Sequence, residues 1–439
     1  MSEQVFVLFN LTEKLPIMFR TDTMGLIFAA ISTFIWIICG IYSFEYFKGD
    51  KKAKRYAIFY VITLIVIVCL DLSGNLITFY LFYELMTLLS VPLVFHNETK
   101  EAIMAALKYL FYSLCGAYMA LFGLYFVYKN AETIEFTKGG VLATQITSEN
   151  QTILLVAILL MVLGFSVKGG MFPMHAWLTS AHPVAPAPAS AFLSGIIVKG
   201  GVLGIIRTIF YIAGPDMIRG TFVQYVLLIL SITTIFLGSM LAYKEKLFKK
   251  RLAYSTVSQV SYILFGIFIL NPVALTGSLL HVIAHAIIKT GLFLCAGIVI
   301  HETGKEYVDD LKGIGKQMKG MLWCFAIVSM GLVGIPPLSG FISKWYLCVG
   351  SLEEAVSVYS YLGPTILLVS ALLTAGYLLT IVVKGFVPGA DFDAEQNPKI
   401  HVSPVMMVPV IILAILTVAI GVFPNPLIDC FKTLAESIF

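Results

Sequence analysis

Two histidines and a lysine recur at four-residue intervals within one apolar segment, HVIAHAIIKTGLFLCAG. His281, His285 and Lys289 would share one face of a helix, with a rise of about 6 Å between successive members. Histidine titrates near neutral pH and a desolvated lysine can do so too, so this spacing favours a proton relay. Two alternatives stay open. One is a metal site, which is disfavoured because the segment lacks HExxH and any carboxylate. The other is a purely structural polar stripe along the helix.

A single carboxylate stands in the apolar segment NLITFYLFYELMTLLSVPLVF. This residue, Glu84, has mostly apolar neighbours for more than a turn in each direction, so its side chain needs a partner or stays protonated. Lys108 and Lys168, in the next two apolar segments, are the available cations. A Glu–Lys pair in low dielectric has coupled protonation, which suits proton transfer. A static pair that fixes helix packing is the alternative.

Five lysines fall inside apolar segments: Lys108, Lys168, Lys199, Lys289 and Lys344. A lysine at the centre of a membrane helix costs about 2.5–3.5 kcal/mol, so five would cost on the order of 15 kcal/mol unless paired or hydrated. Lys108 and Lys199 lie where they can partly extend toward the interface. The other three have apolar sequence on both sides, which favours a function within the membrane.

Two apolar segments contain helix-breaking residues close to a lysine, in KGGMFPMH and in GIPPLSGFISKW. Proline removes a backbone donor and clashes with the preceding turn. Broken backbone at membrane depth is tolerated only where it is buried in protein or faces a hydrated cavity. Two such segments in corresponding places are typical of an inverted repeat with its ion path at the breaks. The residues expected to break the helices are Gly169, Gly170, Pro173, Pro336 and Pro337.

The composition indicates an all-α polytopic membrane protein. Of 439 residues, 59% are hydrophobic and 12% are charged, whereas soluble domains carry about 25% charged residues. The apolar runs are each about 20 residues long, as a bilayer core requires, and they are continuous rather than alternating, which argues against a β-barrel. We expect twelve spans: 24–44, 56–72, 75–96, 101–128, 151–178, 187–213, 221–243, 252–270, 275–301, 320–348, 361–384 and 404–429.

Basic residues concentrate in loops on one side of these spans, chiefly 48–55, 244–251 and 305–319. The positive-inside rule makes this side cytoplasmic and places both termini outside. Arg207 is assigned to the opposite, outer side. The seven cysteines stand singly without a CxxC or Cys/His cluster, so no iron–sulfur or zinc site is supported.

The spans suggest four parts. The ranges are an N-terminal segment with the first span (1–55), two inverted five-helix repeats, each with one broken helix (56–213 and 221–384), and a C-terminal span (385–439). The broken helices are the fifth and tenth spans. Because the sequence likeness between the repeats is weak, their existence is inferred from the breaks.

Several motifs occur in an order that resembles a known family. They are KGGMFPMHAWLTSAHPVAPAPASAFLSG, KKRLAYSTVSQVSYILFG, HVIAHAIIKTGLFLCAGIVI and GIPPLSGFISKWY. The chain resembles the antiporter-like subunits of respiratory complex I, whose fold also occurs in membrane-bound energy-converting hydrogenases, formate hydrogenlyase and Mrp-type sodium/proton antiporters. The resemblance extends over about 22–430. Members usually have fourteen helices, so we expect this chain to lack the first two.

The resemblance implies a role for each buried group. Glu84 matches the acid that pairs with the lysine of the first broken helix, Lys168, and Lys199 matches the central lysine of the following helix. His281, His285 and Lys289 resemble the connecting residues of the second half-channel, and Lys344 resembles the lysine of the second broken helix. The implied function is translocation of H⁺, or of H⁺ and Na⁺, in a prokaryotic cytoplasmic membrane.

The resemblance also implies partners. The chain would bind no cofactor and carry no redox site, whereas partner subunits would hold iron–sulfur clusters or a nickel–iron site. Homologous antiporter-like subunits, small membrane subunits and a peripheral redox module are the expected neighbours. Three functions are weighed: a subunit of a redox-driven complex, a subunit of a Mrp-type antiporter, and a scaffold without pumping. The costly intramembrane lysines argue against the scaffold.

Overall fold

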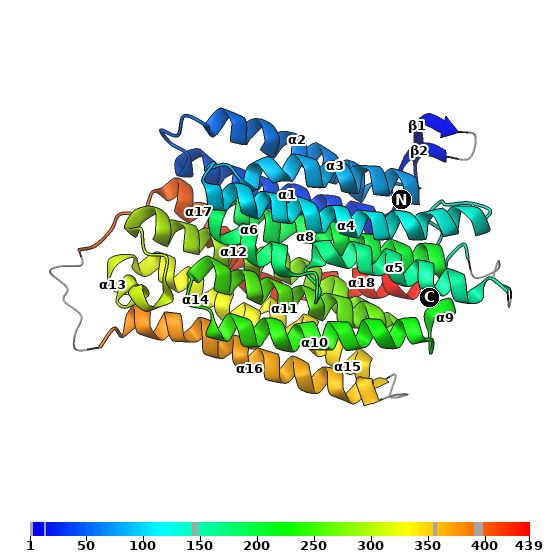
Figure 1. The fold of residues 1–439 in the computed structure, drawn as a ribbon. Coiled ribbons are helices and arrows are strands. Elements are labelled where there is room, and N and C mark those ends of the chain that lie inside the picture. Colours follow the sequence, from blue (N-terminus) through cyan, green and yellow to red (C-terminus); the bar gives the residue numbers. More distant parts are fainter. Residues whose placement is uncertain (1–2, 13–14, 143–146, 148, 354–357, 390–397) are drawn as a thin grey trace.

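The computed structural model describes residues 3–12, 15–142, 147, 149–353, 358–389 and 398–439. Helices run roughly parallel or antiparallel along one long axis, and both termini lie at the same end of the bundle (Figure 1). The loops between α1 and α2 and between α3 and α4 lie at the opposite end, which we call the lysine-rich end (Figure 1).

Eleven helical spans in the described part of the chain are long and apolar enough to cross a membrane. They are α1 (Thr23–Tyr46), α2 (Ala53–Asp71), α3 (Leu76–Val94), α4 (Lys100–Asn130), α5 (Gln151–Gly169), the composite helix Ala187–Ala213, α10 (Phe222–Lys244), α11 (Phe248–Ile269), α12 (Pro272–Thr303), α16 (Val358–Phe386) and α17 (Pro404–Val422). The prediction of an all-α polytopic membrane protein is therefore confirmed.

The composite helix contains two π-helical segments that the sequence does not predict. Its parts are α7 (Ala187–Phe192), η1 (Leu193–Ile197), α8 (Val198–Ile206) and η2 (Arg207–Ala213). π-Segments inside helices are often found at functional sites. The composite helix, α11 and α12 form the centre of the bundle, since nearly all of their residues are buried.

Shorter elements complete the described chain. They are β1 (Val5–Thr12), β2 (Leu15–Arg20), α6 (Ala176–Val184), α9 (Pro215–Ile218), η3 (Val308–Leu311), α13 (Ile314–Gln317), α14 (Lys319–Val333), α15 (Ser339–Glu353) and α18 (Asn425–Glu436). The predicted span 151–178 comprises α5 and α6, and the predicted span 320–348 comprises α14 and α15. The expected division into two inverted five-helix repeats stays a prediction.

The antiparallel hairpin of β1 and β2 is an element that the sequence analysis does not predict. Its second strand is tied to α3, because Thr78 Oγ1 accepts a hydrogen bond from the backbone N–H of Met18 at 3.0 Å and Asn75 donates to the carbonyl of Pro16 at 2.7 Å. All of β1 is exposed. The hairpin thus lies outside the helical bundle, at the end that carries the termini (Figure 1).

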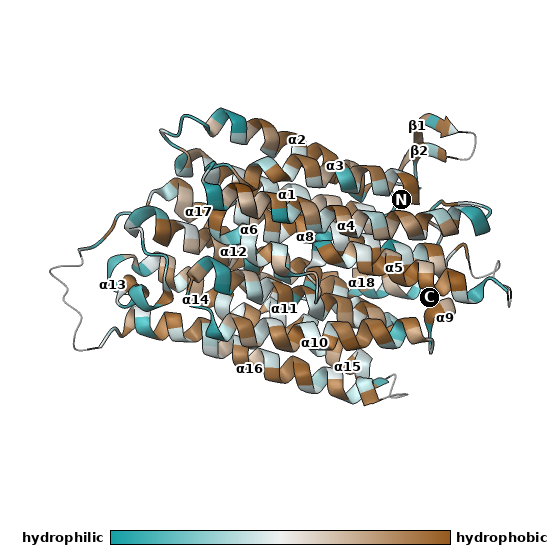
Figure 2. Cartoon of the chain, viewed as in Figure 1, coloured by the Kyte–Doolittle hydropathy of each residue, from teal (hydrophilic) through white to brown (hydrophobic). Residues whose placement is uncertain are grey.

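The outer helices consist mostly of hydrophobic residues along their length, whereas hydrophilic residues concentrate toward the ends and in the loops (Figure 2). This distribution is what a bilayer requires of a helical bundle, because hydrocarbon offers no partner to polar groups. The buried charged residues described below are therefore exceptions that need a physical explanation.

Candidate ion-translocation site

Lys168 lies in the last turn of α5, immediately before the helix ends. Gly170 follows as a left-handed cap with φ of +72°, a conformation that favours glycine. A lysine at this position also stabilises the negative end of the helix dipole. Trp177, in α6, donates a hydrogen bond to the carbonyl of Val167 at 2.7 Å, so one backbone acceptor freed by the break is satisfied inside the protein.

Three hydroxyl groups surround the ammonium group of Lys168. Its Nζ donates to Thr87 Oγ1 at 2.5 Å, to the Tyr109 hydroxyl at 3.0 Å and to Ser113 Oγ at 3.2 Å. The same ammonium lies 5.4 Å from the ring centroid of Tyr83 and 4.6 Å from that of Tyr109. These contacts hold a fully buried lysine, to which no carboxylate of the described residues is directly bonded.

Glu84 lies on α3, one helical turn from Thr87. It interacts electrostatically with Lys168, but no hydrogen bond or ion pair joins them in the described part of the chain. Its Oε1 atom is buried and has no hydrogen-bond partner among the described residues. The two predicted partners thus lie near the same cluster of hydroxyl groups, with Thr87 in contact with the lysine. A small displacement of α3 would change their separation.

Lys108, the other cation considered for Glu84, turns toward α6. Its Nζ donates to Ser180 Oγ at 3.0 Å, and the residue is only partly buried. Lys108 and Lys168 therefore contact different hydroxyl groups, on α6 and on α3 and α4 respectively.

Lys199 reaches from the composite helix to α12, where its Nζ lies 2.6 Å from Nδ1 of His285. It also donates to the carbonyl of Ser194, in the π-segment η1, at 2.8 Å. A hydrogen bond between an ammonium and a doubly protonated imidazole has no acceptor. At most one proton can therefore occupy this contact.

Small residues let the composite helix approach α5 near Lys168. A Cβ added at Gly201 would lie 2.5 Å from the carbonyl oxygen of Phe165 and 2.8 Å from Cβ of Lys168. The glycine pair that follows Lys199 in the sequence thus brings two of the buried lysines onto neighbouring helices in contact.

The ladder expected on α12 is present for the histidines, and Lys289 turns away to another helix. The rings of His281 and His285 lie 6.1 Å apart between centroids, and both Nε2 atoms are buried without a hydrogen-bond partner in the described structure. Lys289 Nζ donates to the carbonyl of Leu252 at 2.9 Å and to Ser255 Oγ at 2.7 Å, both on α11.

Lys344 lies just after the second break and folds back over it. Its Nζ donates to the carbonyls of Leu332 and Val333 at 2.6 and 2.9 Å. These belong to the last turn of α14, whose carbonyls lack helical partners and favour a cation. The neighbouring Ser343 makes a 2.8 Å contact with His281 Nδ1, so the second broken helix touches the histidine pair.

The two breaks differ in where the lysine stands. In the first, Lys168 precedes the break and Gly169 closes α5, with Pro173 in the connection to α6. In the second, Lys344 follows the break, and Pro336 and Pro337 lie in the connection between α14 and α15. The Phe172–Pro173 and Pro336–Pro337 peptide bonds are both cis.

Sequence reasoning missed several buried polar groups. Arg207, counted with the basic residues of the outer side although it falls within the predicted span 187–213, is buried at the start of η2 and forms a two-pronged ion pair with Asp22, the N-cap of α1. The nearby Asp71 is buried at the end of α2 and accepts a hydrogen bond from Ser32 at 3.0 Å. The signal for Arg207 was ambiguous, because a charge near a predicted span end can lie inside or outside the membrane.

His182 is a second missed group. It is fully buried in α6, stacks on Phe293 with 4.7 Å between centroids, and has no hydrogen bond from either ring nitrogen to the described residues. It interacts electrostatically with Lys249 and Lys289. The available signal was a histidine within the proline-rich stretch AHPVAPAPAS.

The fold and this row of buried groups are those expected of an antiporter-like membrane subunit. The family model described as NADH:quinone oxidoreductase/Mrp antiporter, transmembrane, matches residues 73–374. NADH-quinone oxidoreductase subunit N of Desulforudis audaxviator is 31% identical over 405 residues, which cover 89% of this chain and 78% of that protein. The chain therefore belongs to the NADH:quinone oxidoreductase/Mrp antiporter family.

Further similarities come from the antiporter side of the family. A Na(+)/H(+) antiporter subunit of Alkalihalophilus pseudofirmus is 27% identical over 99% of this chain and 86% of that protein. A chain in the structure of the Mrp complex from Dietzia sp. shares the fold with a TM-score of 0.87 and 21% identity, covering 99% of this chain and 87% of that one.

Proposed function

We propose that this chain is a proton-translocating subunit of a redox-driven membrane complex of the complex I or energy-converting hydrogenase type. The observation that carries the proposal is the 2.6 Å contact between Lys199 and His285. It joins the composite helix to α12, and so connects the lysines near the first break with the histidines near the second.

The proposed cycle begins at Glu84 and Lys168. An event in a neighbouring subunit displaces α3, which changes the distance between the carboxylate and the ammonium and therefore the protonation of Lys168. The change passes to Lys199 through the close approach of their helices. Because Lys199 and His285 cannot both be fully protonated at their contact, a proton arriving at one drives the other to release its own.

The path continues from His285 to His281 and through Ser343 to Lys344. Lys289 and Lys108 provide side branches toward α11 and α6. We further propose that this chain binds no cofactor and that partner subunits carry the iron–sulfur clusters or the nickel–iron site. Orientation with both termini outside belongs to the same proposal and follows from the charge bias.

The test uses the intact complex, purified and reconstituted into proteoliposomes. We expect Glu84→Gln and Lys168→Ala each to reduce ion translocation at least tenfold while the complex remains assembled. A matched control is Lys319→Ala, which removes an exposed lysine at the lysine-rich end. Unchanged pumping in both variants would overturn the proposal.

A Mrp-type antiporter is an equally supported second candidate. It is favoured by the alignment of the Na(+)/H(+) antiporter relative over 99% of this chain. Subunits that copurify with the chain separate the two candidates: a redox module supports the first, whereas membrane subunits alone, with Na⁺-dependent proton exchange, support the second.

A further inference from the structure

A groove opens on the outer surface between α1 and α2, toward the lysine-rich end. Its volume of about 490 Å³ lies within the range of small-molecule sites, about 300–1,000 Å³. The lining is almost entirely apolar and includes Trp36, Gly40, Phe47, Tyr56 and Tyr60. The site thus has the character of an apolar binding groove on the face formed by α1 and α2.

The wall of the groove is held in shape by its own hydrogen bonds. Trp36 and Tyr60 stack with 5.4 Å between ring centroids and 13° between planes. Trp36 Nε1 donates to the carbonyl of Tyr60 at 3.1 Å, and the Tyr60 hydroxyl donates to the carbonyl of Trp36 at 2.7 Å. Gly40, one turn after Trp36 on α1, also lines the groove, and a Cβ there would lie 3.6 Å from Cε1 of Tyr60.

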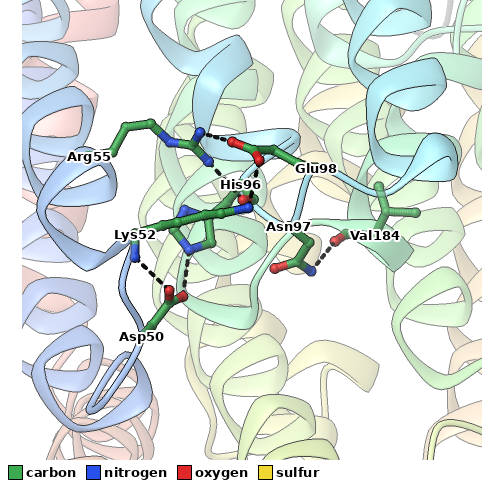
Figure 3. Close-up of polar contacts among 7 residues, drawn as sticks. All are labelled: Asp50, Lys52, Arg55, His96, Asn97, Glu98 and Val184. Carbon is green, nitrogen blue, oxygen red and sulfur yellow. Dashed lines mark hydrogen bonds and ion pairs between the residues drawn. The ribbon is translucent and has the colours of Figure 1, made fainter.

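The basic residues beside the groove differ in whether they form ion pairs. Lys52 and Arg55 both pair with Glu98 on the α3–α4 loop, on the side shown in Figure 3. Lys48 lies 3.3 Å from Glu45. Lys54, in contrast, lines the groove and forms no ion pair with any residue that the structure describes.

We propose that this groove binds an anionic phospholipid, with an acyl chain along the apolar wall and the phosphate at Lys54. Clusters of basic residues next to a membrane helix attract anionic lipids. The loop 48–55 is such a cluster, and the Glu98 pairs leave Lys54 as the cation directed to the groove. Charge complementarity thus favours a lipid with a net negative head group over a zwitterionic lipid or an apolar protein helix.

The test is native mass spectrometry of the delipidated complex with added phosphatidylglycerol or phosphatidylcholine. We expect the wild type to bind phosphatidylglycerol more tightly than phosphatidylcholine. Lys54→Ala should weaken phosphatidylglycerol binding about fivefold, the equivalent of losing about 1 kcal/mol, and leave phosphatidylcholine binding unchanged. Lys319→Ala, on α14 away from the groove, is the matched control and should bind as the wild type does.

A second variant tests the location. A Cβ at Gly40 would lie 3.6 Å from Cε1 of Tyr60, an ordinary contact, so Gly40→Trp fills the groove with little disturbance of the backbone. It should abolish the strongest phosphatidylglycerol binding. Equal binding of the two lipids by the wild type, unchanged binding by Lys54→Ala or Gly40→Trp, or a partner subunit cross-linked within the groove would each overturn the proposal.

Discussion

Nζ of Lys199 lies 2.6 Å from Nδ1 of His285, although the two residues are 86 positions apart in the sequence. The contact joins a lysine of the composite helix, which contains the two π-segments, to a histidine of α12, the longest described helix. Both side chains are buried. A substitution at this contact that keeps the packing but removes the titratable group can therefore distinguish a role in proton transfer from a role in packing.

His285→Asn should abolish translocation while the protein stays folded. The amide oxygen of asparagine can accept the hydrogen bond of Lys199, but the amide cannot bind and release a proton near neutral pH. We expect at least a tenfold loss of proton pumping by the reconstituted complex, with little change in thermal stability. His301→Ala removes an exposed histidine from the same helix and serves as the control. Wild-type pumping by His285→Asn would exclude a relay role for this residue.

Asp22→Asn should destabilise the protein strongly, because it leaves the buried Arg207 guanidinium without its carboxylate. Breaking a buried pair in this way costs about 3–5 kcal/mol. The measurement is thermal or denaturant unfolding in detergent. The double variant Asp22→Asn/Arg207→Met removes the unpaired charge and should recover much of the loss. A change below about 0.5 kcal/mol in the single variant would show that the pair has no structural role.

Gly201→Ala should disturb both stability and transport. The added methyl group would meet the backbone of α5 at 2.5 Å, so α8 must move away from Lys168. Overpacking of this kind costs about 1–3 kcal/mol, and we expect proton pumping to fall several-fold in the fraction that remains folded. Gly320→Ala is the control, because its nearest neighbour would be a methionine methyl group at 3.8 Å. Equal effects of the two substitutions would contradict this account.

The loop network in Figure 3 should make stability depend on pH. Hydrogen bonds from Lys52 and Arg55 lower the pKa of Glu98 from 4.5 to about 2. Because the folded-state pKa is depressed, the stabilisation is present above about pH 4.5 and is lost as the pH falls toward about 2.

Glu98→Gln should accordingly lower the unfolding temperature at neutral pH, and its difference from the wild type should shrink in acid. Asp429→Asn, which removes an exposed carboxylate with no ion pair in the described structure, should show no such pH-dependent difference. A constant difference between Glu98→Gln and the wild type across this range would refute the assignment. The same network includes a 2.8 Å contact between His96 and Asp50, which lowers the pKa of Asp50.

Composition and hydrophobic run length were sufficient to predict the membrane class and the position of most spans, because a bilayer demands long apolar helices whatever their packing. The unusual lysines at 168, 199, 289 and 344 could be recognised in the same way, since each contradicts its apolar surroundings. Arg207 shows the limit of this reasoning, because its distance from a span end did not reveal that Asp22 holds it inside.

Which buried groups touch was decided by the tertiary structure alone. Regular helical spacing places His281, His285 and Lys289 in order, yet Lys289 turns to α11 while Lys199 reaches His285 from another helix. The spacing along one helix determines only a shared face, whereas the contact across helices depends on close approach at glycines such as Gly201 and on the register of the bundle. The sequence by itself therefore determined which residues could carry protons, and the packing of the helices decided which of them are connected.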